Sequence, residues 1–147
     1  MSNYKHILLA VDFSEHSKEV VLKAKELADY YQAELSLIHV VDSVPLVDIG
    51  YETAMPFDYD LNEIFMNSAK AKLQELARDL ELSFKESWLE LGSPKTEIVR
   101  IATENAVDLI VVGSHGRHGL GLLLGSTANA VLHHAPCDVL AVRLKDD

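Results

Sequence analysis

The chain has 147 residues, 48% of them apolar and 24% charged, and this length and balance suit one domain around one hydrophobic core. Acidic residues outnumber basic residues 23 to 13, for a net charge of −10, so the chain lacks the cationic surface by which proteins bind nucleic acids. No apolar stretch reaches the roughly 18 residues that span a membrane, the first is too short for a signal peptide, and the single cysteine excludes an intrachain disulfide. We therefore expect a cytoplasmic protein with no nucleic-acid or membrane partner, in a single domain over residues 1–147.

The first part of the chain alternates between apolar runs and amphipathic stretches. Residues 7–11 are apolar and rich in strand-forming types, which predicts a strand buried on both faces that ends at Asp12. Ser14 fits the N-cap of a helix that runs to about Ala33, because apolar residues recur there at helical spacing. A second buried strand is predicted over residues 35–41.

Residues 42–58 are irregular, yet they carry several large apolar side chains. A loop of this length inside a compact domain is usually functional or a partner surface, so we expect a protein partner to meet this segment. Asp60 and Glu63 have capping-box spacing and predict a helix through about Leu82. Residues 83–91 predict a weaker third strand.

The last part of the chain continues the alternation. Residues 92–94 read Gly-Ser-Pro, which predicts a helix with the serine as its cap and the proline in its first turn. A fourth strand is predicted over 107–112, a helix over 126–134 and a fifth strand over 138–144. Alternation of this kind favours an α/β fold, a three-layer open parallel sheet of five strands with helices on both faces.

Five of the seven glycines lie between residues 113 and 125, in the stretch VVGSHGRHGLGLLLGST. A strand, then glycines, then the start of a helix is an arrangement in which backbone amides hold a phosphate. Arg117 adds a forked cation, and Ser126 and Thr127 add hydroxyl donors. Asp12 follows another strand and suits ribose hydroxyls, or Mg²⁺ held through water. The pattern therefore indicates a nucleotide-binding site.

Plainer interpretations stay open for each of these features. The glycine loop is alternatively a flexible connection, and Asp12 a helix cap. His39 reads as a hydrogen-bonded core histidine, and Cys137 as a small buried residue without nucleophilic function. No P-loop, GxGxxG, GxSxG, CxxC or HExxH pattern occurs, so the sequence names no catalytic residue and no protein metal ligand set.

Three segments together resemble the universal stress protein A family: YKHILLAVDFSEHS, LSLIHVVD and DLIVVGSHGRHGLGLLLGSTANAVLHHAPCDVLAVR. The resemblance covers nearly the whole chain, and the glycine segment is its most specific part. It implies a nucleotide-binding, Rossmann-like fold with strand order 3-2-1-4-5 and a cytoplasmic homodimer joined through the last strand, here residues 137–144.

One branch of that family binds ATP through the pattern G-x2-G-x9-G-[ST]. By resemblance, the loop glycines and Ser126 hold the phosphates, Asp12 meets the ribose, and Ala10 and Val40 frame the adenine. This chain has eight residues rather than nine between Gly116 and Gly125, a difference that the extra loop glycines can absorb. The full set of expected nucleotide-binding residues is Ala10, Val11, Asp12, Val40, Gly113, Gly116, Arg117, Gly125, Ser126 and Thr127.

Three functions follow as hypotheses. The first is a stress-response or regulatory protein that binds ATP or a related nucleotide as a homodimer. The second is a dimeric protein-interaction module whose loop is only structural. The third is a weak nucleotide hydrolase that uses Asp12 and Mg²⁺.

Overall fold

The computed structural model describes residues 4–13, 17–41, 58–79, 84–114 and 126–143. Its strands form one sheet with the order β3-β2-β1-β4-β5, and every neighbouring pair is parallel. The strands are β1 (His6–Ala10), β2 (Glu34–Val41), β3 (Ser87–Leu91), β4 (Leu109–Gly113) and β5 (Asp138–Val142). The predicted fold class and strand order are confirmed.

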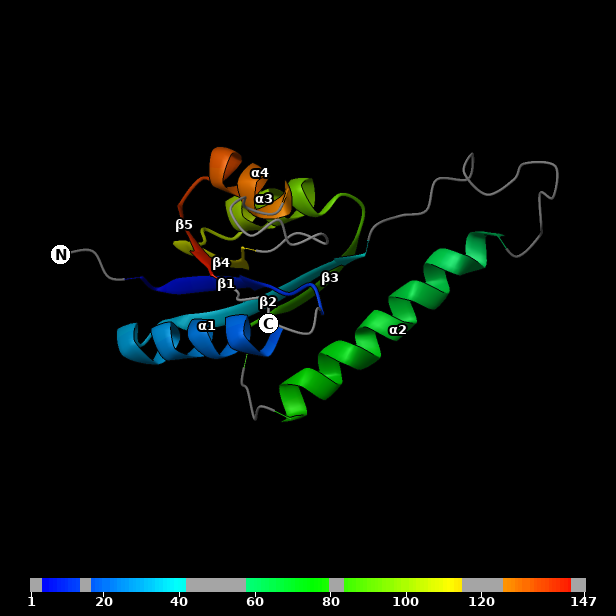
Figure 1. Ribbon diagram of the computed structural model, residues 1–147, viewed down its shortest axis with the longest axis horizontal. Helices are drawn as coiled ribbons and strands as arrows, with labels where there is room; N and C mark the ends of the chain where they lie inside the picture. The colour runs from blue at the N-terminus through cyan, green and yellow to red at the C-terminus, as the bar shows by residue number, and fades with distance from the viewer. Residues whose placement is uncertain (1–3, 14–16, 42–57, 80–83, 115–125, 144–147) are drawn as a thin grey trace.

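Four helices complete the three layers. They are α1 (Ser17–Tyr31), α2 (Asp58–Asp79), α3 (Pro94–Glu104) and α4 (Ser126–His134). Figure 1 shows α1 and α2 on one face of the sheet and α3 and α4 on the other. The chain first moves from β1 to β2 and β3 on one side of the sheet and later to β4 and β5 on the other side. Because the crossovers are right-handed, the helices of the two halves lie on opposite faces.

The two faces of the sheet bury separate hydrophobic clusters. Ile7, Leu9 and Val111 lie in the cluster beneath α1 and α2, whereas Leu8 and Ile110 lie in the cluster beneath α3 and α4. Side chains alternate between faces along a strand, so central strands covered by helices on both sides need apolar residues at every position. The continuous apolar runs in the sequence have this cause.

The ends of several elements differ from the predictions. β1 begins and ends one residue earlier than expected, at His6 and Ala10, and the Val11 carbonyl just past its end accepts a hydrogen bond from a side chain of β2. β3 begins at Ser87 rather than near residue 83. α3 begins at Pro94 as predicted, but the Ser93 side chain makes no capping hydrogen bond. The predicted cap Ser14 lies outside the described residues.

Among the residues that the structure describes, the buried polar side chains are those of His6 and Ser36. His6 Nε2 lies 2.7 Å from the Ser36 hydroxyl oxygen, and His6 Nδ1 lies 3.3 Å from the Asn105 carbonyl oxygen. The backbone N–H of His6 donates to the Asp108 carboxylate at 2.9 Å. Each partner offsets the cost of burying a polar group, and together they fasten β1 to β2 and to the segment that leads into β4.

Within the described parts of the chain, no helix combines the length and the apolar character needed to cross a membrane.

The packing predicts a clear contrast between two isoleucines. Ile110 on β4 is fully buried, whereas Ile64 on α2 is 57% exposed. Ile110→Ala is expected to lower the free energy of unfolding by about 2–5 kcal/mol, because it leaves a cavity in the sheet. Ile64→Ala makes the same chemical change at the surface and is expected to cost less than about 0.5 kcal/mol. Urea unfolding of both variants measures the difference, and equal losses would contradict this account of the core.

Candidate functional site

The centre of the candidate site is the point where β1 and β4 leave the sheet. The two strands pair up to Leu9 opposite Val111. Beyond that register the chain turns from β1 toward α1 on one face and from β4 toward α4 on the other. Ligands of open parallel sheets bind at the carboxyl ends of the strands where the direction of crossover changes. Asp12 and Gly113 therefore lie at the edge of the sheet where a ligand is expected.

Asp12 lies two residues after the end of β1 and is exposed. Its preceding residue is fixed to the sheet, because the Val11 N–H donates to the Ile38 carbonyl at 2.9 Å. Ser114, which follows β4, likewise donates its N–H to the Val142 carbonyl at 2.9 Å. These two amides are therefore engaged within the protein. We expect donors for an anion to come from other groups, and contact of Val11 with a nucleotide stays a prediction.

Ala10 and Val40 lie on the same face of the sheet. Val40 is a buried member of the cluster beneath α3 and α4, and the half-buried Ala10 packs against that cluster. They belong to neighbouring strands, with Ala10 in register with Ile38, two positions before Val40. The structure thus brings together the two side chains expected to frame a base, on the face where α4 begins.

The glycine loop connects β4 to α4. Gly113 ends β4 in register with Val142, and α4 begins at Ser126 as predicted. Thr127, in the first turn of α4, is half-buried. Gly116, Arg117, Gly125 and the Ser126 side chain lie outside the described residues. Their contacts with a ligand stay predictions.

His39 is the site feature that sequence analysis identified only in part. The expected hydrogen bond is confirmed, since the ring Nδ1 lies 2.6 Å from the Val11 carbonyl oxygen, but the residue is half-buried rather than part of the core. Phe13, on the other side of Asp12, has a φ of 60° and lies with its ring centroid 4.3 Å from that of His39. No sequence motif pairs a histidine with a particular carbonyl. Both contacts come from the register between β1 and β2.

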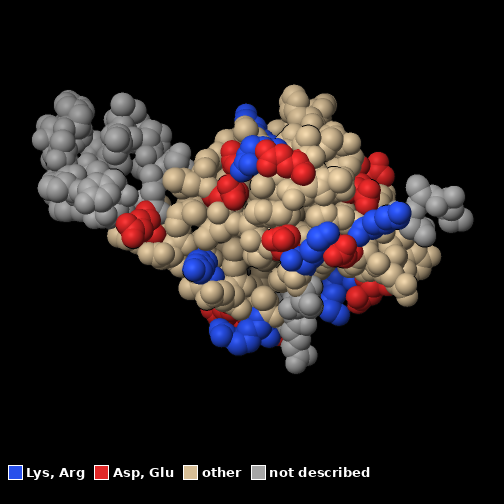
Figure 2. All heavy atoms as spheres, turned by 180° about the vertical axis from the view of Figure 1, so that it is seen from behind, with Lys and Arg blue, Asp and Glu red and all other residues tan. Residues whose placement is uncertain are grey.

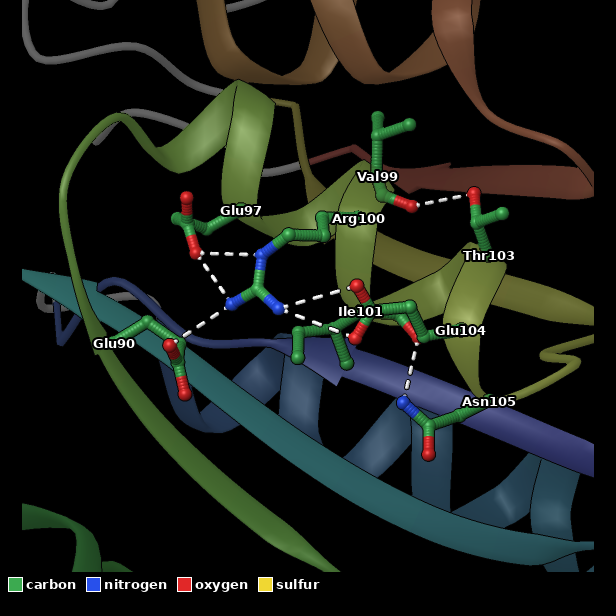
Figure 3. A network of polar contacts seen from close by, with 8 residues as sticks. All are labelled: Glu90, Glu97, Val99, Arg100, Ile101, Thr103, Glu104 and Asn105. Carbon is green, nitrogen blue, oxygen red and sulfur yellow. Dashed lines mark hydrogen bonds and ion pairs between the residues drawn. The ribbon is translucent and has the colours of Figure 1, made fainter.

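A charged network joins β3 to α3. Arg100 contacts the carboxylates of Glu90, Glu97 and Glu104 at 3.0, 2.7 and 3.2 Å. Figure 3 shows the guanidinium between these three acids, and the hydrogen bond to Glu97 is the main cause that raises the pKa of Arg100 above its ordinary value. Three carboxylates around one cation leave a local excess of negative charge. Arg100 therefore braces α3 and is not available to an anionic ligand.

The charged side chains outside this network are spread over the surface. Figure 2 shows acidic and basic side chains interspersed on one face of the molecule, without a continuous basic surface. Among the residues that the structure describes, no three His, Cys, Asp or Glu side chains are grouped so that they could hold a metal ion. Local backbone dipoles and the residues of the glycine loop thus become the main candidates for stabilising an anion.

Comparisons with known proteins agree with this arrangement of strands. The family model described as "Universal stress protein family" matches residues 3–143. The chain belongs to the universal stress protein family.

Universal stress protein A homolog 2 of Coxiella burnetii is 44% identical over 146 residues, which cover 99% of each chain. The solved structure of hypothetical protein MJ0577 is 32% identical, with a TM-score of 0.81 over 99% of this chain and 100% of that one. A universal stress protein solved in complex with cAMP is 25% identical, with a TM-score of 0.64 over 96% of this chain and 98% of that one. Sequence and fold therefore match this family over nearly the whole length.

The one cysteine of this universal stress protein is unsuited to nucleophilic chemistry at neutral pH. Burial raises the pKa of the Cys137 thiol to about 11, and the nearby carboxylates of Asp138 and Asp108 act in the same direction. A thiol reacts as its thiolate, so a raised pKa keeps it neutral and slow to react. The raised pKa agrees with the expectation that Cys137 has no nucleophilic function, but the residue is half-buried rather than buried.

This environment predicts the pH dependence of alkylation. The rate of iodoacetamide reaction with the folded protein is expected to rise with pH to a midpoint near 11, because only then is half of Cys137 ionised. The same measurement in denaturant gives the midpoint of an unhindered thiol as the control. A folded-state midpoint at or below that of the denatured protein would show that the thiol is not desolvated.

Proposed function

We propose that this universal stress protein binds ATP, or a related adenine nucleotide, at the carboxyl edge of β1 and β4 and acts in the cytoplasm as a stress-response or regulatory protein. One observation carries the proposal. β1 and β4 are neighbouring parallel strands, so the segment that holds Asp12 and the glycine loop that starts at Gly113 leave the sheet at the same edge, where the direction of crossover changes.

Each part of the nucleotide has a candidate partner there. Ala10 and Val40 supply an apolar surface for the adenine, and Asp12 accepts hydrogen bonds from the ribose or holds Mg²⁺ through water. The loop amides, Arg117 and the first turn of α4 provide donors and positive dipole for the phosphates. Hydrogen bonds to a charged acceptor contribute roughly 1.5–3 kcal/mol each, so three or four suffice for micromolar affinity after the entropy cost of binding.

The related structures support a nucleotide as the ligand class. A protein that shares this fold and 25% of its residues was solved with cAMP bound. The loop of this chain has eight residues between Gly116 and Gly125. Gly119 and Gly121 lie within that span and permit backbone conformations that let a shorter loop reach the phosphates.

Hydrolysis, on this proposal, is weak or nil. Asp12 with water-bound Mg²⁺ is the group best suited to assist water attack, and no described histidine or carboxylate stands out as a general base beside it. The protein is then a nucleotide-responsive regulator rather than an efficient ATPase.

Calorimetric titration of the full chain with ATP and Mg²⁺ tests the proposal. The wild type is expected to bind, and Asp12→Asn is expected to raise Kd roughly tenfold to hundredfold, because it removes a charged acceptor. Asp79→Asn is the matched control, since it makes the same change at the exposed end of α2 and is expected to leave Kd unchanged. Titration with cAMP and with inorganic phosphate identifies which part of the nucleotide is recognised.

Gly116→Val extends the test to the loop. A β-branched side chain there is expected to abolish nucleotide binding while the circular dichroism spectrum and the melting temperature stay near those of the wild type. Absence of ATP binding in the wild type, together with an intact dimer, would favour the alternative function of a protein-interaction module that uses residues 42–58. Normal binding by Gly116→Val would show that the loop assignment is wrong.

The proposed functional unit is a homodimer joined through β5. This strand is at the end of the sheet among the described strands, and its residues from Val139 to Val142 are apolar and only half-buried. An edge of this kind exposes unpaired backbone groups that readily pair with another strand. A second copy of the same strand satisfies both the hydrogen bonds and the apolar side chains.

The register identifies which backbone groups face a partner. The Val142 carbonyl accepts from the Ser114 N–H, so it points toward β4. Backbone groups alternate in direction along a strand, so Leu140 also points toward β4, and Ala141 points its N–H away from the sheet. Proline is tolerated only where the missing N–H faces outward.

Ala141→Pro is therefore expected to convert the dimer to a monomer while each chain stays folded. Leu140→Pro is the matched control, because it removes a hydrogen bond within the β4–β5 ladder and is expected to lower the melting temperature. Analytical ultracentrifugation and thermal melting measure the two effects. A dimer that survives Ala141→Pro would point to a different interface.

A further inference from the structure

His39 clamps the backbone that precedes Asp12. The Val11 N–H donates to the Ile38 carbonyl at 2.9 Å, and the Val11 carbonyl lies 2.6 Å from Nδ1 of His39. A carbonyl oxygen only accepts hydrogen bonds, so Nδ1 carries the proton and donates it. Both polar groups of the residue before Asp12 are thus bonded to consecutive residues of β2.

The same ring also meets the residue after Asp12. Phe13 has a φ of 60°, in the left-handed region that a bulky side chain adopts only when its surroundings hold it there. Its ring lies 4.3 Å from that of His39 between centroids, at an interplanar angle of 50°. Lys72 of α2 lies above the Phe13 ring at 5.9 Å from the centroid. The two neighbours of Asp12 are therefore both held by His39.

His39 acts from the face opposite to the expected adenine. Val40 and Ile38 lie in the cluster beneath α3 and α4, and side chains alternate along β2, so His39 points toward α1 and α2. Phe13 packs against the cluster on that same face. The ring can thus influence a ligand on the other face through the backbone that it holds.

We infer that His39 is a positioning residue for nucleotide binding: its Nδ1–H bond to Val11 and its contact with Phe13 set the direction in which the Asp12 carboxylate leaves the sheet. This role rests on the proposed function, because Asp12 is the group that would meet the ribose or the metal-bound water. A precise orientation matters because a charged hydrogen bond weakens steeply when its donor and acceptor are misaligned.

Two variants of similar size separate the hydrogen bond from the bulk of the ring. His39→Asn keeps a donor, since the asparagine amide nitrogen can occupy the place of Nδ1. His39→Leu has nearly the same branched shape and no donor. We expect His39→Leu to raise the Kd for ATP roughly tenfold and His39→Asn to raise it less than about threefold, with similar melting temperatures for the two variants.

A double-mutant cycle with Asp12→Asn tests whether the effect passes through the carboxylate. If His39 acts by aiming Asp12, the loss caused by His39→Leu is expected to shrink toward nil when Asp12 is already replaced. Additive losses would overturn the inference, because they would mean a general structural effect. Equal losses in His39→Asn and His39→Leu, or wild-type affinity in His39→Leu, would overturn it as well.

His6 offers a matched control on the same sheet. It is also a hydrogen-bonded histidine, but it bonds Ser36 on β2 near the opposite edge of the sheet. His6→Leu is expected to lower the melting temperature while leaving the Kd for ATP within about twofold of the wild type. An equal effect of His6→Leu on affinity would show that any buried histidine of the sheet has the same influence.

One measurement needs no nucleotide and so separates this inference from the proposed function. The ring ¹⁵N shifts of His39 are expected to show a protonated Nδ1, and amide exchange at Phe13 is expected to be faster in His39→Leu than in His39→Asn. If the wild type binds no ATP but these signals appear, the proposed function fails while the clamp stands. An unprotonated Nδ1 would overturn the clamp itself, whether or not ATP binds.

Discussion

The parallel pairing of β1 with β4 is the constraint on which the candidate site depends. β1 is the first strand of the chain and lies in the middle of the sheet, with β2 on one side and β4 on the other. The chain therefore leaves neighbouring strands toward opposite faces, and the two departing segments are the Asp12 turn and the glycine loop. Apolar burial on both faces fixes this pairing, since a slip by one residue would exchange every side chain between the two clusters.

Because the net charge of the chain is negative, an anion at this site has to be stabilised by groups close to it rather than by the overall charge of the protein. The chain carries a charge of −10, and several described lysines and Arg100 are already paired with carboxylates. Exposed pairs of this kind contribute little to stability. Oriented amides do not repel an acidic surface and need no long side chain to be ordered. A glycine loop beside the start of a helix therefore suits an acidic protein better than a basic patch.

The fold could be predicted from the sequence because its main signals are periodic and redundant. Continuous apolar runs predicted the central strands, and the helical spacing of apolar residues predicted α1 and the position of α4. The start of the edge strand β3 could not be predicted to the residue. β3 is short and only half-buried, so residues 83–86 carry no pattern that separates strand from loop. Asp12 could be placed at the site because it directly follows the apolar run of residues 7–11, which predicts a buried strand.

Contacts that depend on register could not be predicted in the same way. Three such features depend on the exact register between two strands. They are the bond from His39 to the Val11 carbonyl, the positive φ of Phe13 and the buried His6–Ser36 pair. A histidine in an apolar strand signals a hydrogen bond but not its partner. The Arg100 network likewise joins a strand residue to a helix, and only its helical spacings are visible in the sequence.

The central position of β1 also orders the events of synthesis. Ile7 pairs with Leu35 soon after it leaves the ribosome, but its second partner, Leu109, follows about a hundred residues later. Until then one side of β1 has no neighbouring strand, and its unpaired backbone groups form an open edge. Nascent chains of this protein thus expose a pairing edge until β4 has been synthesised.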